Sequence, residues 1–532
     1  MQNELIAAVD LGSNSFRLEV GRVVEDQIYT LDSLKEAVRL ASGLTPERYM
    51  DEASQRRALA ALAKFGERIR GFAPEQVRAV ATNTLRVAKN AAEFLPKAEA
   101  ALGFPIEIIA GREEARLIYI GAAHSLPLVP HKRLVVDIGG GSTEFIIGKR
   151  FEPQSMESLF MGCVSYTGRF FPDGRMDKKR FREAEVAAGK EIQTIAYDYL
   201  RLGWKEAVGS SGSARAIADV LELNGLNPGG AVGITRAGME RMKALLIKAG
   251  SLDALDLEGL KSDRLPVIPG GLAIMMAVFQ ELNLERMTYA DGALRLGVLY
   301  DLLGRFHHSD MRDATVTQFM RRYQVDSAQA ARVEQVALTV FRALTPGRAD
   351  THPVEHVNDE HFLCWAARLH ELGLSVAHNG YHKHGAYILT FADMPGFSKK
   401  EQARLAMLVL GHKGKLQKVG GLPYGDVNWL MVFALRLATI LLRSRESKPP
   451  SEWGVRAGDK GFLLELPGDW LAANPLTAAA LSDEVDAWRG VGLTFRLKSR
   501  GRGELSGNLT VLPVEGVSAG TDGMAPILTQ AA

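Results

Sequence analysis

At 532 residues the chain is too long for a single hydrophobic core, and about 150 residues per domain predicts three or four domains. Apolar residues make up 46% of the chain and charged residues 24%, which is typical of a globular protein and excludes a disordered or membrane-embedded one. The formal net charge is only +2, so any basic surface for a polyanion must be local.

The cysteine content and the hydropathy pattern exclude further classes. Cys163 and Cys364 are too few for a disulfide framework or a zinc cluster, which fits a reducing compartment. The N-terminus lacks a basic segment followed by a long apolar run. The most apolar helix candidate, 429–442, contains Arg436 and is shorter than the roughly 20 residues of a membrane span. We therefore expect a cytoplasmic protein with no membrane span and no nucleic-acid partner.

Two stretches repeat one design. Residues 8–20 (AVDLGSNSFRLEV) and 135–147 (VVDIGGGSTEFII) each predict an apolar strand that ends in an acid, a glycine- and hydroxyl-rich turn, and a second strand. Asp10 aligns with Asp137, Gly12 with Gly139 and Ser15 with Ser142. The repeat predicts a duplicated domain whose halves face each other across a cleft.

Strands and helices alternate from residue 1 to about residue 305, which predicts an α/β architecture. Between the repeats the pattern predicts a helix over 51–71, a strand over 77–81 that runs into a polar loop over 82–86, a strand over 106–109 and a helix that opens at 110–116. After the second repeat it predicts a helix over 178–199, a strand over 206–208, a helix over 272–282 that follows Pro269-Gly270-Gly271, a strand over 287–289 and a closing helix through Leu303.

From about residue 306 helical periodicity dominates, over 311–323, 328–344, 360–372, 399–410 and 427–443. A linker over 444–451 precedes strands over 462–466, 493–497 and 507–512 and a helix near 477–489. We predict four domains: two ribonuclease-H-like domains over 1–124 and 125–305, an all-α domain over 306–445 and a small α+β domain over 446–532.

The order of these motifs resembles the exopolyphosphatase / guanosine pentaphosphate phosphohydrolase family of the sugar kinase–Hsp70–actin superfamily. The resemblance rests on the two hairpins, on 82–86, 111–116 and 209–213, and on His370-Glu371 with Tyr381-His382-Lys383-His384. It implies two actin-type, ribonuclease-H-like domains, a helical HD-related domain as in long exopolyphosphatases, and a homodimer.

The hairpins predict a site for phosphate and a divalent metal. Asp10 and Asp137 at strand ends can bind Mg²⁺ or Mn²⁺, and the resemblance adds Glu144 as a metal ligand. Each aspartate alone could instead cap its own turn. Backbone N–H groups and hydroxyls of glycine-rich turns suit phosphate. The predicted phosphate-binding residues are Gly12, Ser13, Asn14, Ser15, Gly139, Gly140, Gly141, Ser142, Thr143, Gly209, Ser210, Ser211, Gly212 and Ser213.

Hydrolysis needs a base that takes a proton from the attacking water. The resemblance places the catalytic glutamate at Glu114 rather than at Glu113, although either could simply compensate a helix dipole. Arg86 could clamp a phosphate in two hydrogen bonds or form a surface ion pair.

The helical domain offers a basic track for a long polyanion, of which the predicted residues are His378, His382, Lys383, His384, Lys413 and Lys415. The alternative is a solvated helix face. An HD metal centre needs an adjacent His-Asp pair, and this chain has His370-Glu371 instead.

We predict an exopolyphosphatase that releases terminal orthophosphate from inorganic polyphosphate, because the long C-terminal half favours a polymer. The alternative in the same class is the 5′-phosphohydrolase of guanosine pentaphosphate. Less favoured are an ATP-dependent phosphotransferase and a non-catalytic phosphate- or nucleotide-binding module.

Overall fold

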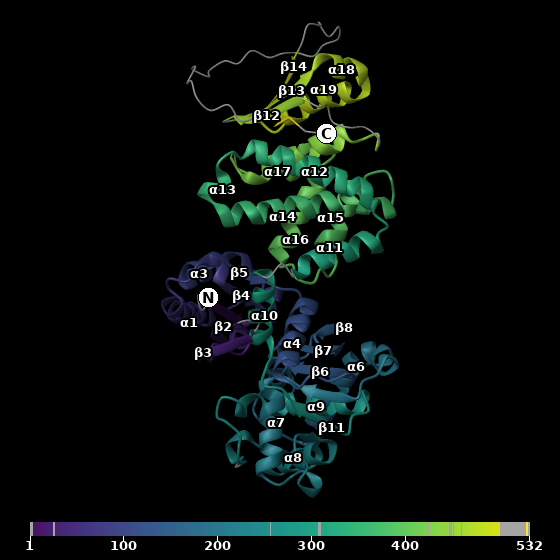
Figure 1. The fold of residues 1–532 in the computed structure, drawn as a ribbon. Coiled ribbons are helices and arrows are strands. Elements are labelled where there is room, and N and C mark those ends of the chain that lie inside the picture. Colours follow the sequence, from purple (N-terminus) through teal and green to yellow (C-terminus); the bar gives the residue numbers. More distant parts are fainter. Residues whose placement is uncertain are drawn as a thin grey trace. The chain divides into compact units, whose positions relative to one another are not determined.

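The computed structural model describes residues 4–24, 27–255, 257–306, 310–423, 425–445, 450, 452–458, 460–500 and 528–529. The chain forms two compact units (Figure 1). The N-terminal unit contains residues 1–311 and 395–399, and the C-terminal unit contains residues 312–394 and 400–532.

The N-terminal unit contains two sheets built on one plan. The first has the strand order β3-β2-β1-β4-β5, and the second has the order β8-β7-β6-β9-β11 with β10 added at its edge. In both sheets the first two pairings are antiparallel and the next two are parallel. The duplication predicted from the two hairpins is therefore present in the fold.

The strands of the first sheet are β1 (Glu4–Leu11), β2 (Phe16–Val24), β3 (Gln27–Glu36), β4 (Val77–Ala81) and β5 (Ile106–Ile108). Those of the second are β6 (Lys132–Ile138), β7 (Thr143–Lys149), β8 (Glu152–Leu159), β9 (Glu206–Gly209), β10 (Ile234–Thr235) and β11 (Arg286–Tyr289). β2 alternates between buried and half-buried residues because one face packs on the core, whereas β4 is buried throughout.

The helices of this unit are α1 (Glu52–Arg68), α2 (Asn83–Val87), α3 (Ala91–Leu102), α4 (Gly111–Ser125), α5 (Cys163–Phe170), α6 (Lys178–Leu202), α7 (Gly212–Leu223), α8 (Arg236–Ala249), α9 (Ile268–Glu281) and α10 (Leu294–Phe306). Several of these helices begin at a residue whose side chain caps the free N–H groups of the first turn. Asp51 accepts a hydrogen bond from the Ser54 N–H at the start of α1, and Ser211 accepts one from the Ala214 N–H at the start of α7.

Helices α4 and α10 pack together between the two sheets (Figure 1), in a core that also takes side chains from β1, β4, β6, β7 and β9. The two helix backbones approach closely because glycines lie at the contact. A Cβ atom on Gly297 would lie 1.7 Å from the Leu117 carbonyl oxygen, and one on Gly121 would lie 2.0 Å from the Ala293 carbonyl oxygen. The side-chain-free contact therefore holds the two halves of the unit at a defined spacing.

We expect Gly297→Ala to lower the free energy of unfolding by about 3 kcal/mol, because the new methyl group overlaps a backbone atom that cannot move alone. Denaturant unfolding of the whole chain measures this. Gly168 in α5 has no atom within 4 Å of a built Cβ, so Gly168→Ala is the matched control, with a gain of about 0.5–1 kcal/mol. Equal stability of the two variants would contradict the proposed contact.

A buried ion cluster joins β4, α4 and α10. Arg116 forms two 2.8 Å hydrogen bonds with Glu113 and also pairs with Asp301, while Arg78 lies 2.6 Å from Asp301. The Gly396 N–H donates to the Glu113 carboxylate at 2.8 Å. These partners fully occupy Glu113, so it has a structural role.

The C-terminal unit begins with helices and ends with a small sheet. Its helices are α11 (Met311–Arg322), α12 (Ser327–Leu344), α13 (Arg348–Thr351), α14 (Pro353–Leu369), α15 (Tyr381–Phe391), α16 (Lys399–Gly411), α17 (Val427–Leu441), α18 (Gly468–Ala473) and α19 (Pro475–Arg489). The strands β12 (Glu452–Gly458), β13 (Gly461–Pro467), β14 (Thr494–Arg500) and β15 (Leu528–Thr529) have the order β14-β13-β12-β15.

Several local expectations were wrong. Residues 83–87 form the short helix α2 instead of a polar loop, because Asn83, Thr84 and Leu85 are buried against the core. Helix α9 begins at Ile268, so Pro269 occupies its first turn, where a missing N–H costs nothing. Helix α15 and strand β12 were not predicted, and the predicted strand over 507–512 lies outside the described residues.

Candidate active site

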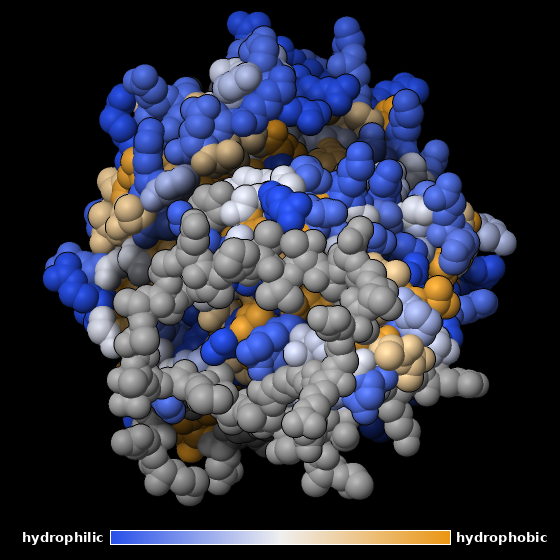
Figure 2. All heavy atoms as spheres, turned by 90° about the horizontal axis from the view of Figure 1, so that it is seen from above, coloured by the Kyte–Doolittle hydropathy of each residue, from blue (hydrophilic) through white to orange (hydrophobic). Residues whose placement is uncertain are grey.

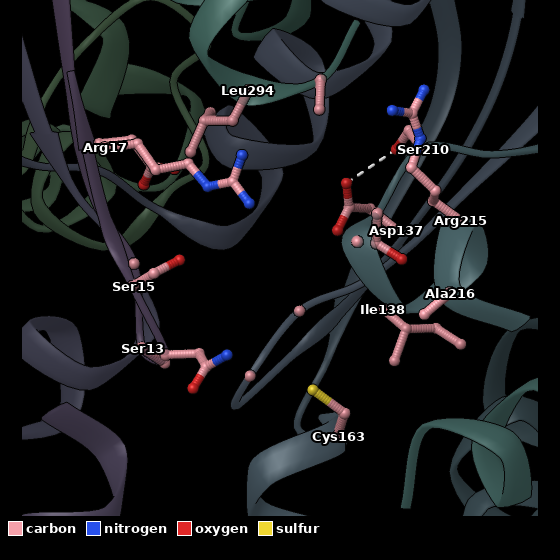
Figure 3. A pocket seen from close by; sticks show the side chains of 18 of the residues that line it. Ser13, Ser15, Arg17, Asp137, Ile138, Cys163, Ser210, Arg215, Ala216 and Leu294 are labelled. Carbon is pink, nitrogen blue, oxygen red and sulfur yellow. Dashed lines mark hydrogen bonds between the residues drawn. The ribbon is translucent and has the colours of Figure 1, made fainter. Parts of the chain in front are cut away.

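A cavity of about 530 Å³ lies in the N-terminal unit, between the two hairpins. Figure 3 shows Ser15 and Arg17 on one wall, with Asp137 and Ser210 facing them. The cavity brings together many of the predicted site residues: Asp10, Gly12, Ser13, Asn14, Ser15, Glu114, Asp137, Gly139, Gly140, Ser142, Ser210, Ser211 and Gly212. Arg86, Gly141, Thr143, Glu144, Gly209 and Ser213 do not line it.

The strand register places the two aspartates in equivalent positions. Asp10 of β1 is paired with Arg17 of β2, and Asp137 of β6 is paired with Glu144 of β7. The cross-strand neighbour of the aspartate is thus a cation in the first half and an acid in the second. The duplicated hairpins have diverged in charge while they keep their geometry.

Asp10 and Asp137 are both buried and short of hydrogen-bond donors. Burial raises the pKa of Asp10 to about 6; Arg295 and Arg17 oppose the rise, and Asp137 adds to it. Asp10 Oδ1 is buried without a hydrogen-bond partner. Burial also raises the pKa of Asp137, against the 2.7 Å hydrogen bond that the Ser210 hydroxyl donates to its Oδ2 (Figure 3).

These two carboxylates fit a divalent cation. Mg²⁺ is usually bound by one or two carboxylates, with water and substrate phosphate completing its coordination. The orphaned Asp10 oxygen and the mutual repulsion of the acids are the features that a cation would relieve. Within the described ranges no group of three or more His, Cys, Asp or Glu side chains is arranged to hold a metal.

Glu114 reaches the cavity from the first turn of α4, whereas its neighbour Glu113 belongs to the ion cluster. Burial raises the pKa of Glu114 to about 7, opposed by the charge and hydrogen bond of Arg86 and reinforced by Asp10 and Asp137. A carboxylate with a pKa near neutrality is well matched to proton abstraction.

Arg86 lies against Glu114, with Nη1 3.1 Å from Glu114 Oε2 and 2.9 Å from the Ile109 carbonyl oxygen. Its predicted role in binding phosphate stays a prediction. The sequence could not distinguish the two partners, because both are anions at the same edge of the sheet.

We expect Arg86→Gln to raise the pKa of Glu114, because the cation that lowers this pKa is removed. The acid limb of the pH–rate profile, which reports the ionisation of Glu114 as a base, should therefore move to higher pH. At pH 7 the rate should fall by about ten-fold, and it should recover partly by pH 9. Arg112 lies in the same helix as Glu114 and pairs with Glu157 at 2.5 Å. Arg112→Gln is therefore the control and should leave the acid limb of the profile at its wild-type pH. An identical limb in both variants would contradict the role of Arg86.

Glu144 lies behind the cavity wall rather than on it. Burial raises its pKa well above the ordinary value, and Glu114 and Asp137 raise it further. The Ser158 hydroxyl donates to its Oε1 at 2.8 Å. Its predicted role as a metal ligand stays a prediction.

The glycines of the second hairpin serve the approach of the two halves. A Cβ on Gly140 would lie 2.9 Å from the Ser13 Cβ, and one on Gly141 would lie 2.5 Å from Asn83 Oδ1. Gly140 is required by Ser13 of the opposite hairpin and Gly141 by Asn83 of α2, and the sequence did not reveal these tertiary neighbours. Gly139 and Gly140 still line the cavity.

Of the predicted phosphate-binding residues at the end of β9 and the start of α7, some line the cavity and others do not. Ser211 and Gly212 line the cavity at the N-terminus of α7, where free N–H groups favour an anion. Gly209 ends β9, and the Ser213 hydroxyl donates to the Ile138 carbonyl. Thr143 likewise donates to the Met161 carbonyl, so both hydroxyls are taken by the backbone.

The sequence analysis missed the cations of the cavity, which are Arg17, Lys35, Arg215, Lys261, Arg264 and Arg295. The guanidinium of Arg264 lies against Gly212: a Cβ atom on Gly212 would be only 2.2 Å from Arg264 Nη2. No ion pair is recorded for Arg17, Lys261 or Arg264 in the part of the chain that the structure describes. Arg17 could have been found from the hairpin register, but no local motif marks the loop that carries Lys261 and Arg264.

In the C-terminal unit the predicted track is mixed in exposure. His378, Lys383 and Lys415 are exposed, His384 and Lys413 are half-buried, and His382 is buried. The Lys418 Nζ donates to His382 Nε2 at 2.6 Å, and burial with the charge of Lys418 lowers the pKa of His382 to about 4. His382 is therefore neutral and part of the core at this point.

Comparison with known proteins shows to which family the chain belongs. The Ppx/GppA phosphatase family model matches residues 19–306, and the model for Ppx/GppA phosphatase domain III matches residues 311–485. The chain belongs to the Ppx/GppA phosphatase family. Members of this family are phosphohydrolases that act on phosphoanhydride bonds, so the predicted enzyme class and the recognised resemblance are confirmed.

Curated relatives of this Ppx/GppA chain cover nearly its whole length. A guanosine-5′-triphosphate,3′-diphosphate pyrophosphatase of Aeromonas hydrophila is 37% identical over 502 residues, which are 93% of this chain and 98% of that protein. The protein of the same name from Pseudoalteromonas translucida is 37% identical over 486 residues, 91% of this chain and 96% of its own.

Solved structures resemble the N-terminal part of this Ppx/GppA protein in fold. An exopolyphosphatase-like protein superposes with a TM-score of 0.52 at 23% identity, covering 58% of this chain and all of its own. An exopolyphosphatase from Cytophaga hutchinsonii has a TM-score of 0.51 at 24% identity and covers 57% of this chain and 98% of its own. These similarities confirm the predicted α/β fold.

Proposed function

We propose that this protein removes the terminal 5′ phosphate of guanosine pentaphosphate and releases orthophosphate. One structural observation supports the chemistry: Asp10, Asp137 and Glu114 share a cavity with Arg17, Lys261 and Arg264, for which no ion pair is recorded among the described residues. Such a cavity favours a polyphosphorylated substrate, because these three cations can bind its phosphates.

The substrate proposal reverses the order reached from the sequence. Sequence analysis placed inorganic polyphosphate first because the C-terminal half is long. The relatives from Aeromonas hydrophila and Pseudoalteromonas translucida contain an equally long C-terminal half, since they align over more than 90% of this chain, and both are named for the guanosine nucleotide. Length therefore does not favour a polymer, and polyphosphate becomes the alternative.

The residues of the chain have separate tasks in this proposal. Arg17 and Arg264 hold the phosphates, and the N–H groups at Ser211 and Gly212 stabilise charge on the transferred group. Glu114 takes the proton of an in-line water, which its raised pKa permits at neutral pH. A divalent cation, Mg²⁺ or Mn²⁺, held by Asp10 and Asp137 would supply charge neutralisation when bound.

The test compares substrates on the purified full-length protein. Phosphate release is measured on guanosine pentaphosphate and on long-chain polyphosphate, and the ratio of kcat/KM values is determined with each as a competitor of the other. We expect a higher kcat/KM for the nucleotide and one orthophosphate per nucleotide. A higher value for polyphosphate would restore the first prediction. Transfer of phosphate to an acceptor without release would instead support a phosphotransferase.

Finer features of the C-terminal unit belong to the same proposal. We propose that the helices matched by domain III form an HD-related domain without a metal centre, followed by a small α+β domain, with boundaries near 124, 305 and 445. A homodimer, and a polyphosphate track over the exposed basic residues, complete it. Among the described residues no helix is long and apolar enough to cross a membrane, and the face drawn in Figure 2 is mainly hydrophilic.

A further inference from the structure

Asp219 of α7 is a carboxylate of the cavity for which the described residues provide no ion pair. It is half-buried and lines the cavity on the side of α7. The neighbouring rim acids are paired, Asp263 with Lys35 and Asp291 with Arg215. Across the described ranges no hydrogen bond or ion pair is recorded for the Asp219 carboxylate, although Arg215 lies one helical turn before it. The carboxylate is therefore free to accept hydrogen bonds from a ligand.

Helix α7 connects Asp219 to the phosphate end of the cavity. Gly212, Ala216 and Asp219 share one helix face, because residues three and four apart lie above one another, and all three line the cavity. Seven residues at 1.5 Å each place Asp219 about 10 Å along the helix from Gly212. The Arg264 guanidinium marks the phosphate end at Gly212. A nucleotide with its phosphates there would extend its base along α7.

The wall beside Asp219 is made of small residues. Ala216 is buried on the same face of α7, and Gly259 of the neighbouring loop also lines the cavity. Gly259 has a φ of +83°, and a Cβ there would lie 2.7 Å from the Leu223 side chain and 3.3 Å from the Asp219 carbonyl oxygen. The loop thus packs directly against α7, and neither residue projects a side chain into the space that a flat ring needs.

We propose that Asp219 determines base specificity by accepting hydrogen bonds from the N1–H and 2-amino groups of guanine, an inference that rests on the proposed function. An ionised carboxylate only accepts hydrogen bonds, and guanine presents two adjacent donors on one edge. Hypoxanthine lacks the amino group, and adenine places an acceptor where guanine has N1–H. A buried acceptor left without its donor disfavours such bases.

The test uses three substrates: guanosine pentaphosphate, its inosine counterpart and inorganic tripolyphosphate, which has no base. In the wild type we expect guanosine to be preferred over inosine by about 10-fold or more. Asp219→Asn should lower kcat/KM for guanosine pentaphosphate by about 10²-fold and bring the guanosine-to-inosine ratio close to one. Tripolyphosphate hydrolysis reports that the variant is folded and that its phosphate end is intact.

Asp291→Asn is the matched control, because it removes a carboxylate from the same cavity that already pairs with Arg215. Its guanosine-to-inosine ratio should stay that of the wild type, whatever its absolute rate. An unchanged ratio in Asp219→Asn would overturn the assignment of Asp219 alone. Failure of the wild type to hydrolyse guanosine pentaphosphate would instead overturn the proposed function.

Discussion

Glu114→Gln is expected to lower the rate of phosphate release by about 10²–10⁴-fold while substrate binding is retained. The amide has the shape of the carboxylate but cannot accept the proton of the attacking water. Rapid-mixing measurements of phosphate release, with substrate affinity determined by calorimetry, separate the two effects. In the wild type the acid limb of the rate profile should lie near pH 7, because Glu114 has a pKa of about 7 and must be ionised.

The same substitution should stabilise the fold at alkaline pH. The pKa of Glu114 is raised from 4.5 to about 7, so the folded state binds more protons than the unfolded state between these values, and stability falls as pH rises through that window. Above pH 7 the full penalty of the buried charge is present, about 3 kcal/mol, and the opposing effect of Arg86 is already included in it. We expect Glu114→Gln to regain about 1–3 kcal/mol at pH 8 and nothing at pH 4.

Glu113→Gln is the matched control, one residue away on the same helix. Glu113 is held by Arg116 and by the Gly396 N–H, so its neutralisation should destabilise the protein by about 1–3 kcal/mol. The two neighbours are therefore expected to change stability in opposite directions. If Glu114→Gln were destabilising at pH 8, or if it kept the wild-type rate, the assignment of a buried base would be wrong.

The second large effect is expected from Asp10→Asn. The substitution removes a buried carboxylate with an unpartnered oxygen, and with it half of the charge that Asp10 and Asp137 offer a cation. We expect kcat/KM to fall by about 10³-fold, equivalent to about 4 kcal/mol. Raising the Mg²⁺ concentration should recover part of the loss.

The affinity for Mg²⁺ or Mn²⁺, measured by calorimetry in the absence of substrate, gives a readout that does not depend on turnover. Asp10→Asn should weaken it, whereas Asp291→Asn, which changes an acid already paired with Arg215, should not. An unchanged metal affinity together with an unchanged metal dependence of the rate would exclude Asp10 as a ligand. The cation would then have to be held by Asp137 and the substrate alone.

Local sequence patterns were enough to predict the plan of the N-terminal unit. Two hairpins of the same design predicted the duplication. A strand, the acid at its end and the glycine turn after it are neighbours in the sequence, so each half shows the whole pattern locally. The order of the motifs also predicted the family and the class of reaction. Glu114 was chosen over Glu113 by resemblance, and the structure places Glu114 at the cavity and Glu113 in the ion cluster.

Tertiary structure alone decided what the remaining residues contact. Arg86 faces Glu114, Gly140 makes room for the opposite hairpin and Gly141 for Asn83 of α2. Asp219 of α7 lines the cavity with no ion pair recorded among the described residues. These relations join segments far apart in the chain, so no local pattern records them. Burial acts in the same way, because the pKa values of Asp10 and Glu114 are raised chiefly by desolvation, which only the packed fold creates.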